Sequence, residues 1–158
     1  MGKNIVVLNG SPRKKGNTSA LVREFTRGAE EAGHTVTEFF LDGMGQIYPA
    51  VKECGVVVLA SPLYYWNLSG QLRTAVDRLF ALEEGDGNLL RGHGRGGALL
   101  MAAEGSGFGD VLTYFDHLME NLRWDNLGHV LAGGNGDIGD IQGKPELQQA
   151  FQLGASLR

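Results

Sequence analysis

Residues 5–19 read Ile-Val-Val-Leu-Asn-Gly-Ser-Pro-Arg-Lys-Lys-Gly-Asn-Thr-Ser. The first four residues form a continuous aliphatic run, which is typical of a parallel strand buried on both faces. A loop of Gly, Ser and basic residues follows and leads into the start of an amphipathic helix. The N-terminus of such a helix presents unpaired N–H groups and the positive end of the helix dipole. We therefore expect a phosphate group to bind in this loop, with the hydroxyls of Ser11, Thr18 and Ser19 as further donors.

Two other phosphate-binding motifs do not match the loop. A Walker A motif needs Gly-x-x-x-x-Gly-Lys-Ser/Thr, but counted from Gly10 the second glycine comes one position late, at Gly16, and Asn17 replaces the lysine. A dinucleotide fingerprint needs Gly-x-Gly-x-x-Gly, which Ser11 and Pro12 break at once. The sequence therefore favours a cradle for a phosphomonoester, and an ordinary strand-to-helix turn is the alternative.

The rest of the chain alternates strands and helices. Strands are expected at residues 5–8, 35–41, 55–61, 96–103 and 127–132, and helices at 18–32, 46–54, 69–82, 110–122 and 145–157. Such alternation predicts an α/β fold in one domain, residues 1–158, with a single parallel sheet and helices on both faces. The third strand is the most hydrophobic and should be central, whereas the mixed pattern of the second suits an edge. Residues 83–95 are interpreted as a polar, Gly-rich loop.

Helical periodicity predicts which side chains face the core. The first helix is expected to end at Gly33, and Pro49 must occupy a first turn or a kink. The residues predicted to point inward are Leu21, Val22, Phe25, Ala29 and Ala32 after the first strand, Leu72, Ala75, Val76, Leu79 and Phe80 after the third, and Val111, Leu112, Phe115, Leu118, Met119 and Leu122 after the fourth.

Composition argues against several classes of function. A net charge of −4 does not indicate a nucleic-acid partner or an anionic membrane surface. No apolar signal segment precedes the first strand, and no stretch approaches the roughly 18 apolar residues of a membrane span, so we expect a cytoplasmic location. The single cysteine, Cys54, excludes an internal disulfide and a cysteine-ligated metal or iron–sulfur site within one chain. The four histidines are dispersed, and no metal site is expected.

Three loops should meet at the carboxyl edge of the sheet, namely residues 9–19, 62–70 and 103–109. A phosphate cradle beside an aromatic loop and a Gly-rich loop suits a mononucleotide with a flat ring, and FMN is the economical choice. The alternative is that the aromatic residues cap the core or make a dimer contact. Two further Gly-x-Gly-x-x-Gly matches, at residues 92–97 and 134–139, are interpreted as loops because neither opens a suitable βαβ unit.

Two loop motifs carry a family resemblance. They are Gly10-Ser11-Pro12-Arg13 with Gly16-Asn17-Thr18, and Ser61-Pro62-Leu63-Tyr64-Tyr65-Trp66-Asn67-Leu68-Ser69-Gly70-Gln71-Leu72 with Asp77-Arg78. Together they resemble the NADPH-dependent FMN reductase family of flavodoxin-like fold, and especially short reductases related to iron–sulfur flavoproteins. The resemblance implies a three-layer sandwich with a five-stranded parallel sheet of order 2-1-3-4-5, non-covalently bound FMN, and hydride transfer from NAD(P)H to a flavin, quinone or similar small acceptor. It also implies a homodimer or homotetramer.

The resemblance assigns residues to FMN by position. Ser11, Arg13, Asn17, Thr18 and Ser19 would hold the phosphate, Pro62, Leu63, Tyr64, Tyr65, Trp66 and Asn67 would line the ring, and Ala103, Glu104, Gly105 and Phe108 would close the third side. No catalytic acid or base is required from the protein, because hydride enters and leaves at the flavin. Two alternatives stay open: a flavodoxin-like electron carrier without NAD(P)H activity, and a protein of this fold that binds another phosphorylated ligand.

One departure from the family pattern lies between the second strand and the second helix. Iron–sulfur relatives have a longer segment with cysteines there, whereas residues 41–46 of this chain read Leu-Asp-Gly-Met-Gly-Gln. A cluster therefore has no ligands in this segment. The short connection either leaves the flavin more open on that side or requires a partner subunit to cover it.

Overall fold

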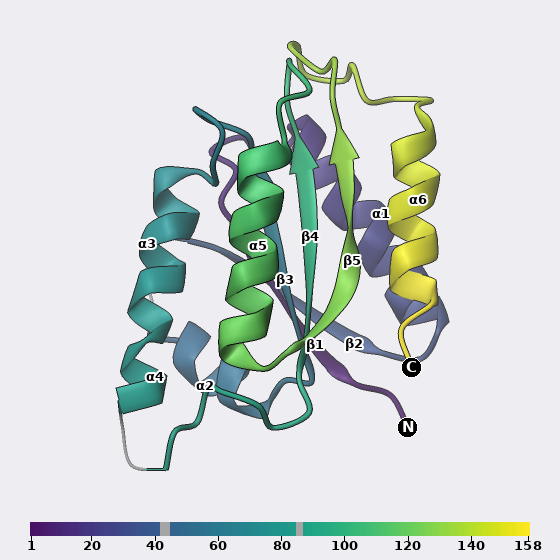
Figure 1. The fold of residues 1–158 in the computed structure, drawn as a ribbon. Coiled ribbons are helices and arrows are strands. Elements are labelled where there is room, and N and C mark those ends of the chain that lie inside the picture. Colours follow the sequence, from purple (N-terminus) through teal and green to yellow (C-terminus); the bar gives the residue numbers. More distant parts are fainter. Residues whose placement is uncertain (42–44, 85–86) are drawn as a thin grey trace.

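The computed structural model of the chain describes residues 1–41, 45–84 and 87–158. Its elements follow one another as β1 (Asn4–Asn9), α1 (Asn17–Glu31), β2 (Thr35–Phe40), α2 (Ile47–Glu53), β3 (Val56–Pro62), α3 (Gly70–Leu79), α4 (Ala81–Glu84), β4 (Gly96–Ala102), α5 (Gly109–Leu122), β5 (Asp125–Ala132) and α6 (Pro145–Ala155) (Figure 1). The strands form one parallel sheet in the order β2-β1-β3-β4-β5. β3 is central and β2 lies at an edge, so the predicted flavodoxin-like topology is confirmed.

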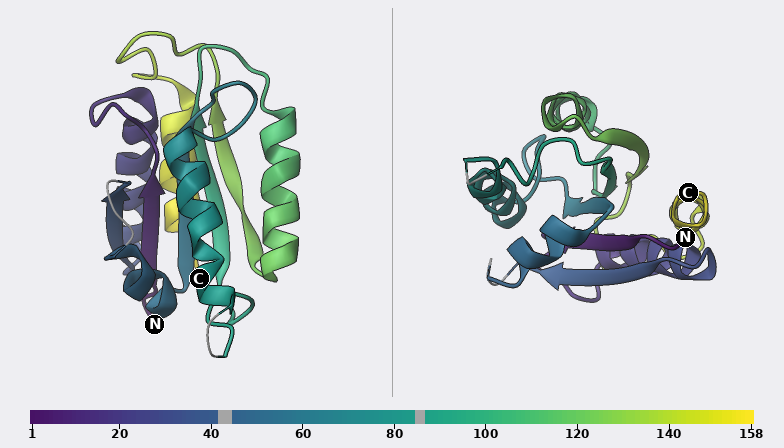
Figure 2. Two further views of the ribbon diagram at one scale, coloured as in Figure 1. Left: turned by 90° about the vertical axis from the view of Figure 1, so that its left-hand side faces the viewer. Right: turned by 90° about the horizontal axis from the view of Figure 1, so that it is seen from below.

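The sheet separates two hydrophobic cores, because alternate residues of a strand point to opposite faces. In β3, Val57 and Leu59 belong to the core under α2, α3 and α5, whereas Val56 and Val58 belong to the core under α1 and α6. Figure 2 shows the two helical layers on opposite sides of the sheet. All four valine and leucine side chains are almost completely buried, as expected for a central parallel strand.

Helices α1 and α6 pack directly against each other, and two glycines allow the close approach. A β-carbon at Gly28 would collide with the carbonyl oxygen of Phe151, and one at Gly154 would collide with the carbonyl oxygen of Phe25. Since the obstacles are backbone atoms, a side chain at either position would force the helices apart. This contact fixes α1, whose N-terminus lies at the carboxyl edge of the sheet.

Helix α1 ends where the sequence predicts. Gly33 has a φ of 87°, and the N–H groups of Gly33 and His34 donate to the carbonyls of Glu30 and Ala29, which is the Schellman arrangement. The turn places β2 directly after the helix. Ala32, predicted to face the core, is exposed because the helix has already ended at this residue.

Residues 83–95 were predicted to be a polar loop, but the described part of this segment includes a helical end and two buried side chains. The short helix α4 extends to Glu84, and Leu90 and Arg95 are buried, at 3% and 4% exposure. The Arg95 guanidinium donates to the carbonyls of Lys52, Cys54, Leu89 and Leu90 at 2.7–3.3 Å. This side chain therefore joins the described part of the segment to the end of α2.

Some helical side chains predicted to face the core do so only partly. Leu72, Ala75 and Leu79 of α3 are buried, but Val76 is half-buried and Phe80 is 54% exposed. In α5, Leu112 and Leu118 are also only half-buried. Val76, Leu112 and Leu118 still pack against the core, so the predictions for these three residues are confirmed in part. The prediction for Phe80 was wrong, because the apolar arc of α3 is wider than the strip that the sheet covers.

Within the described ranges, no helix is long and apolar enough to cross a membrane. The same ranges contain no group of three or more His, Cys, Asp and Glu side chains placed to hold a metal ion. The short connection after β2, which departs from the pattern of iron–sulfur relatives, falls partly on residues 42–44 and so lies partly outside the described residues.

Candidate functional site

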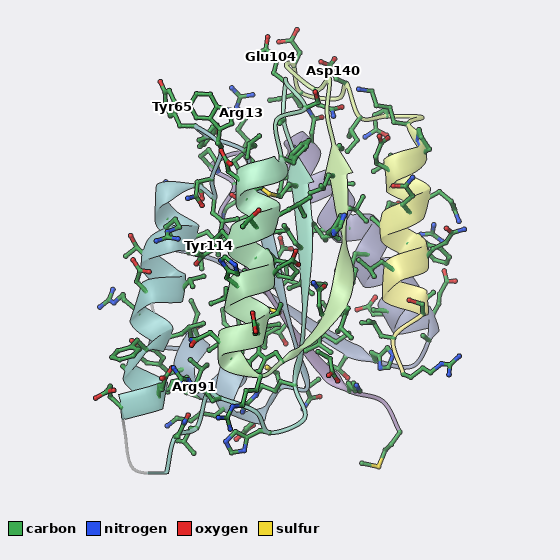
Figure 3. The ribbon with its side chains drawn as sticks, viewed as in Figure 1. Arg13, Tyr65, Arg91, Glu104, Tyr114 and Asp140 are labelled. Atoms are coloured by element: carbon green, nitrogen blue, oxygen red, sulfur yellow. The ribbon has the colours of Figure 1, made fainter. Side chains whose placement is uncertain are left out.

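The loops after β1, β3, β4 and β5 surround a cavity of about 290 Å³ at the carboxyl edge of the sheet. Figure 3 shows Arg13, Tyr65, Glu104 and Asp140 gathered at this edge, each from a different loop. In an open parallel sheet this edge is the usual place for a ligand, because it lies where the connections from β1 and β3 run to opposite faces.

The N-terminus of α1 opens into the cavity with free hydrogen-bond donors. Its N-cap residue is Gly16, and no side chain caps the helix. The N–H groups of Asn17, Thr18 and Ser19 make no hydrogen bond within the described residues. Unpaired donors and the positive helix dipole make this end of α1 suitable for an anion.

The loop before α1 is held in shape by its own hydrogen bonds. The carbonyl of Arg13 accepts from the Gly16 N–H at 2.9 Å, from the Ser19 hydroxyl at 3.2 Å and from the Ser11 hydroxyl at 3.3 Å. The Ser11 N–H donates to Asn9 Oδ1 at 2.9 Å. The loop therefore presents a defined backbone to the cavity, and the Ser19 hydroxyl is engaged in building it.

Thr18 differs from Ser19 in what its hydroxyl contacts. Both residues are 3% exposed. Thr18 lines the cavity, and its hydroxyl makes no hydrogen bond to any described residue. The side chain is largely buried, but its hydroxyl oxygen is not, so the hydroxyl is free to donate to a ligand in the cavity.

The amide of Asn17 ties α1 to the loop after β5. Its Nδ2 donates to the carbonyl of Asp137 at 2.8 Å, and its Oδ1 accepts from the N–H of Gly139 at 3.0 Å. From the other side, Lys144 Nζ donates to the Gly134 carbonyl at 2.7 Å and to Asn135 Oδ1 at 2.9 Å. These contacts hold the loop over the cavity, where it forms one wall.

The aromatic loop after β3 is a tight hairpin. Tyr64 and Asn67 exchange two backbone hydrogen bonds, of 3.0 and 3.1 Å, around a two-residue turn. Tyr65 and Trp66 in the turn have φ values of 48° and 64°, a left-handed conformation that costs a non-glycine residue about 1–2 kcal/mol. Tyr65 is 92% exposed, whereas the Trp66 ring lies against Gly107 of the loop after β4. The strained turn therefore bridges two loops of the site.

The cavity brings together most of the predicted FMN residues. Those that line it are Ser11, Arg13, Asn17, Thr18, Pro62, Leu63, Tyr64, Ala103 and Glu104. The other predicted residues do not line it. Ser19 supports the loop before α1, Tyr65 and Trp66 lie in the hairpin turn, and Phe108 is buried before α5. Asn67 pairs with Tyr64 in the hairpin, and Gly105 lies in the loop after β4.

Sequence reasoning missed the contribution of the loop after β5. Asn135, Gly136 and Ile138 line the cavity, although residues 134–139 were interpreted only as a loop. The available signal was its position after the fifth strand, because all parallel strands of a sheet end at the same edge. Its contact with Asn17 joins residues about 120 positions apart and leaves no local pattern.

Known proteins resemble this chain in sequence and in structure. An iron–sulfur flavoprotein from Archaeoglobus fulgidus is 28% identical over 173 residues, which cover 94% of this chain and 76% of that protein. An NAD(P)H:quinone oxidoreductase from Methanothermobacter marburgensis superposes with a TM-score of 0.75 at 16% identity, covering 98% and 96% of the two chains.

An FMN-dependent NADH-azoreductase from Bacillus anthracis, solved in complex with FMN, superposes with a TM-score of 0.71 at 16% identity, covering 96% of each chain. At such low identities the structural likenesses establish the fold. A family model described as flavodoxin-like fold matches residues 3–152, in agreement with the resemblance of the two loop motifs. The chain therefore belongs to the family of proteins with a flavodoxin-like fold.

Proposed function

We propose that this protein is an FMN-dependent oxidoreductase that takes reducing equivalents from NAD(P)H and passes them to a flavin, quinone or similar small acceptor. The observation that carries the proposal is the N-terminus of α1, which has no side-chain cap and faces a cavity formed by four loops. The Thr18 hydroxyl lies in the same cavity and makes no hydrogen bond to a described residue, so it is a further donor for a ligand. This donor set fits a phosphate monoester.

The residues around the α1 N-terminus fit the phosphate of FMN in charge as well as in geometry. Three free N–H groups and the Thr18 hydroxyl supply donors, and the backbone cradle is already fixed by the bonds to the Arg13 carbonyl. Arg13 stands exposed on the rim and forms no ion pair with a described residue. Its guanidinium adds positive potential where the phosphate dianion would bind.

The opposite part of the cavity suits a flat ring. Pro62, Leu63 and Tyr64 provide one wall, Ala103 and Glu104 another, and the Asn17-anchored loop after β5 a third. Bound FMN supplies the chemistry of hydride acceptance and electron transfer, so the role of these residues is to bind and orient the ring and to exclude water from it. The backbone of the loops supplies N–H and C=O groups for its polar edge.

Relatives support the proposal in different ways. The sequence relative from Archaeoglobus is an iron–sulfur flavoprotein, and structural neighbours include a quinone oxidoreductase and an azoreductase that binds FMN. This chain has only one cysteine, and it is buried at the end of α2. We therefore propose that electrons leave the flavin directly to a small acceptor instead of passing through a cluster within the same chain.

An anaerobic absorbance titration tests the proposal. The purified protein is reconstituted with FMN and titrated first with NADPH and then with NADH, and we expect the oxidised flavin band to bleach within seconds. Bound flavin that neither nucleotide reduces would instead support a flavodoxin-like electron carrier. A protein that does not bind FMN would contradict the site assignment and leave a different phosphorylated ligand as the alternative.

A further inference from the structure

A second cavity at the carboxyl edge of the sheet, of about 230 Å³, lies beside the loop that precedes α1, toward the end of β2. Ser11 and Pro12 line both this cavity and the cavity of the candidate site, so the two are neighbours that share a wall. We call the second one the β2 cavity and define it by Ser11, Pro12, Lys14, Phe40, Leu41 and Gln71.

Three consecutive basic residues of the loop before α1 have different surroundings. Arg13 lines the cavity of the candidate site, whereas Lys14 lines the β2 cavity. Lys15 lines neither of the two and is exposed like its two neighbours. The loop therefore supplies one cation to each cavity and leaves a third cation outside both.

The ammonium group of Lys14 lies at the wall of the β2 cavity against an aromatic ring. Its Nζ is 5.2 Å from the centroid of the Phe40 ring, which is within the range of a cation–π contact. The ion pairs among the described residues do not include Lys14. Because lysine is a compact point charge and an ordinary ligand of phosphate groups, the β2 cavity is suited to an anion.

The other walls of the β2 cavity are suited to a flat ring. Pro12, Phe40 and Leu41 are apolar. Gln71, the second residue of α3, is exposed, and its amide can both donate to and accept from the edge of a base. The lining therefore combines a cation, an amide and apolar walls, which is the chemistry that recognises a phosphorylated nucleoside.

The buried amide beside the β2 cavity already has its hydrogen-bond partners. Asn9 is 1% exposed, and its Nδ2 donates to Glu38 Oε1 at 2.7 Å and to Ser19 Oγ at 3.2 Å. Its Oδ1 accepts from the Ser11 N–H at 2.9 Å. This amide holds the loop in place, so that polar recognition of a ligand is left to the exposed lysine and glutamine of the cavity.

The volume of the β2 cavity indicates that it receives one part of a larger ligand. Pockets for whole small molecules usually measure about 300–1,000 Å³, and this cavity, at about 230 Å³, is smaller. A dinucleotide donor has two parts, a nicotinamide that must meet the flavin and an adenosine at the other end. NADPH differs from NADH by one group only, a phosphate on the 2′ oxygen of that adenosine.

We propose that the β2 cavity binds the phosphorylated adenosine of NADPH, with Lys14 paired to the 2′-phosphate and the adenine ring against the apolar walls. The site rests on the proposed function, which requires a nicotinamide donor, and it makes NADPH the preferred donor. NADH brings no phosphate to Lys14, so it gains nothing from this cation.

Isothermal titration calorimetry with adenosine 2′,5′-bisphosphate tests the site, because this compound is the phosphorylated adenosine of NADPH without the nicotinamide. The wild type should bind it, and Lys14→Gln should weaken binding by roughly tenfold. Lys15→Gln removes the same charge one position further along and should change the affinity by less than about twofold. Both lysines are exposed, so folding is retained. A wild type that does not bind the bisphosphate, or equal losses in the two variants, overturns the proposal.

The preference between the two donors gives a second readout. With FMN bound, the wild type should have a dissociation constant for NADPH at least about tenfold below that for NADH, measured by anaerobic reduction of the flavin over a range of donor concentrations. In Lys14→Gln the two constants should become nearly equal. A wild type without preference, or a preference that Lys14→Gln leaves intact, overturns the proposal.

Fluorescence titration of the wild type with FMN separates a failure of this site from a failure of the proposed function. A protein that binds FMN but not the bisphosphate keeps the proposed function and overturns the β2 site. A protein that binds the bisphosphate through Lys14 but does not bind FMN contradicts the proposed function, while it supports the β2 cavity as a site for a phosphorylated adenosine.

Discussion

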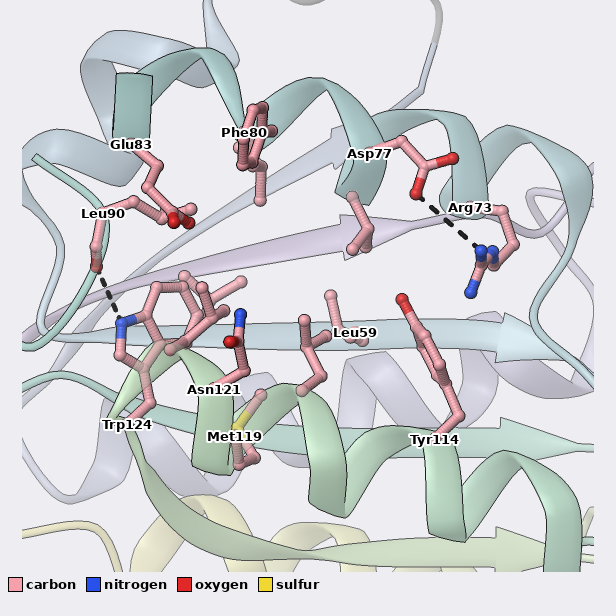
Figure 4. A pocket seen from close by; sticks show the side chains of 15 residues that line it. Leu59, Arg73, Asp77, Phe80, Glu83, Leu90, Tyr114, Met119, Asn121 and Trp124 are labelled. Carbon is pink, nitrogen blue, oxygen red and sulfur yellow. Dashed lines mark hydrogen bonds and ion pairs between the residues drawn. The ribbon is translucent and has the colours of Figure 1, made fainter. Parts of the chain in front are cut away.

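The layer of α1 and α6 and the layer of α3 and α5 cover the same sheet, but they differ in how closely their helices approach. Gly28 and Gly154 let α1 and α6 meet backbone to backbone, so that no space is left between them. On the other face, α3 and α5 leave a cavity of about 340 Å³ with half-exposed apolar walls. The close-packed layer fixes the helix whose N-terminus opens into the candidate site, whereas the open layer has an apolar cavity between its helices (Figure 4).

The largest effect is expected when a side chain is introduced into the close contact between α1 and α6. Gly28→Ala should destabilise the protein by about 3 kcal/mol, because the new methyl group clashes with the backbone carbonyl of Phe151. No side-chain rotation can relieve this clash, since both groups are fixed by the backbone. This loss exceeds the roughly 1 kcal/mol that alanine gains over glycine in helix propensity. Urea unfolding measures the change.

A matched substitution in the open layer serves as the control. Gly70 begins α3, and a β-carbon there would meet no atom within 4 Å. Gly70→Ala should therefore leave the unfolding midpoint unchanged or raise it slightly. Equal destabilisation by the two substitutions would show that the layers do not differ in packing as described.

A second prediction concerns Arg95, the buried arginine that joins the segment before β4 to the end of α2. Arg95→Met should lower the free energy of unfolding by about 2 kcal/mol, since four carbonyls lose a charged donor. Hydrogen exchange of the amides near Leu89 and Leu90 should accelerate. As a control, Arg158→Met at the exposed end of the chain should have no effect. An unchanged stability for Arg95→Met would mean that water replaces the guanidinium at no cost.

Thr18 lies in the first turn of α1, and its hydroxyl should contribute more to FMN binding than to the stability of the fold. Thr18→Val keeps the shape of the side chain and should weaken FMN binding roughly tenfold, because one donor to the phosphate is lost. Thr18→Ser retains the hydroxyl and should bind FMN almost as well as the wild type. Fluorescence titration of FMN measures both variants, and equal affinities for all three proteins would remove Thr18 from the phosphate site.

The smallest expected effect is the contribution of Cys54 to the pH dependence of the free energy of unfolding. Burial raises the pKa of the Cys54 thiol above its ordinary value of 9.0, and the nearby Arg95 offsets only part of this. In the unfolded chain the thiol ionises near its ordinary pKa, while in the folded protein it stays protonated. Its contribution to stability is therefore complete below pH 9.0 and declines as the pH rises above it.

Thiol labelling and substitution separate this contribution from other alkaline effects. The native protein should react slowly with a disulfide reagent at pH 8, and Cys54→Ala should make the decline of stability above pH 9.0 less steep. Rapid labelling under native conditions would show that the thiol is accessible.

The sequence predicted the sheet well because continuous apolar runs such as residues 55–61 and the Gly33 helix end are strong local signals. It predicted the loop between the first strand and the first helix for the same reason, and phosphate binding by this loop stays a prediction. It did not predict the exposure of Phe80, because helical periodicity identifies apolar residues but not what covers them.

Long-range contacts explain the remaining differences. The Arg95 guanidinium donates to carbonyls at the end of α2, about 40 positions earlier in the chain, as well as to the nearby Leu89 and Leu90. Asn17, which was expected to hold the phosphate, contacts a loop near the other end of the chain. The turn at Tyr65 and Trp66 also has no sequence signature, because turns with positive φ angles favour Asn and Gly. The two aromatic residues adopt this conformation within the backbone bridge between Tyr64 and Asn67.

The most direct test of the central claim compares the affinities of FMN and riboflavin, which differ only in the phosphate. If the N-terminus of α1 binds the phosphate, FMN should bind at least about 100-fold more tightly than riboflavin in an equilibrium fluorescence titration. Equal affinities would mean that the free donors of Asn17, Thr18 and Ser19 do not hold the phosphate, and would contradict the proposed site.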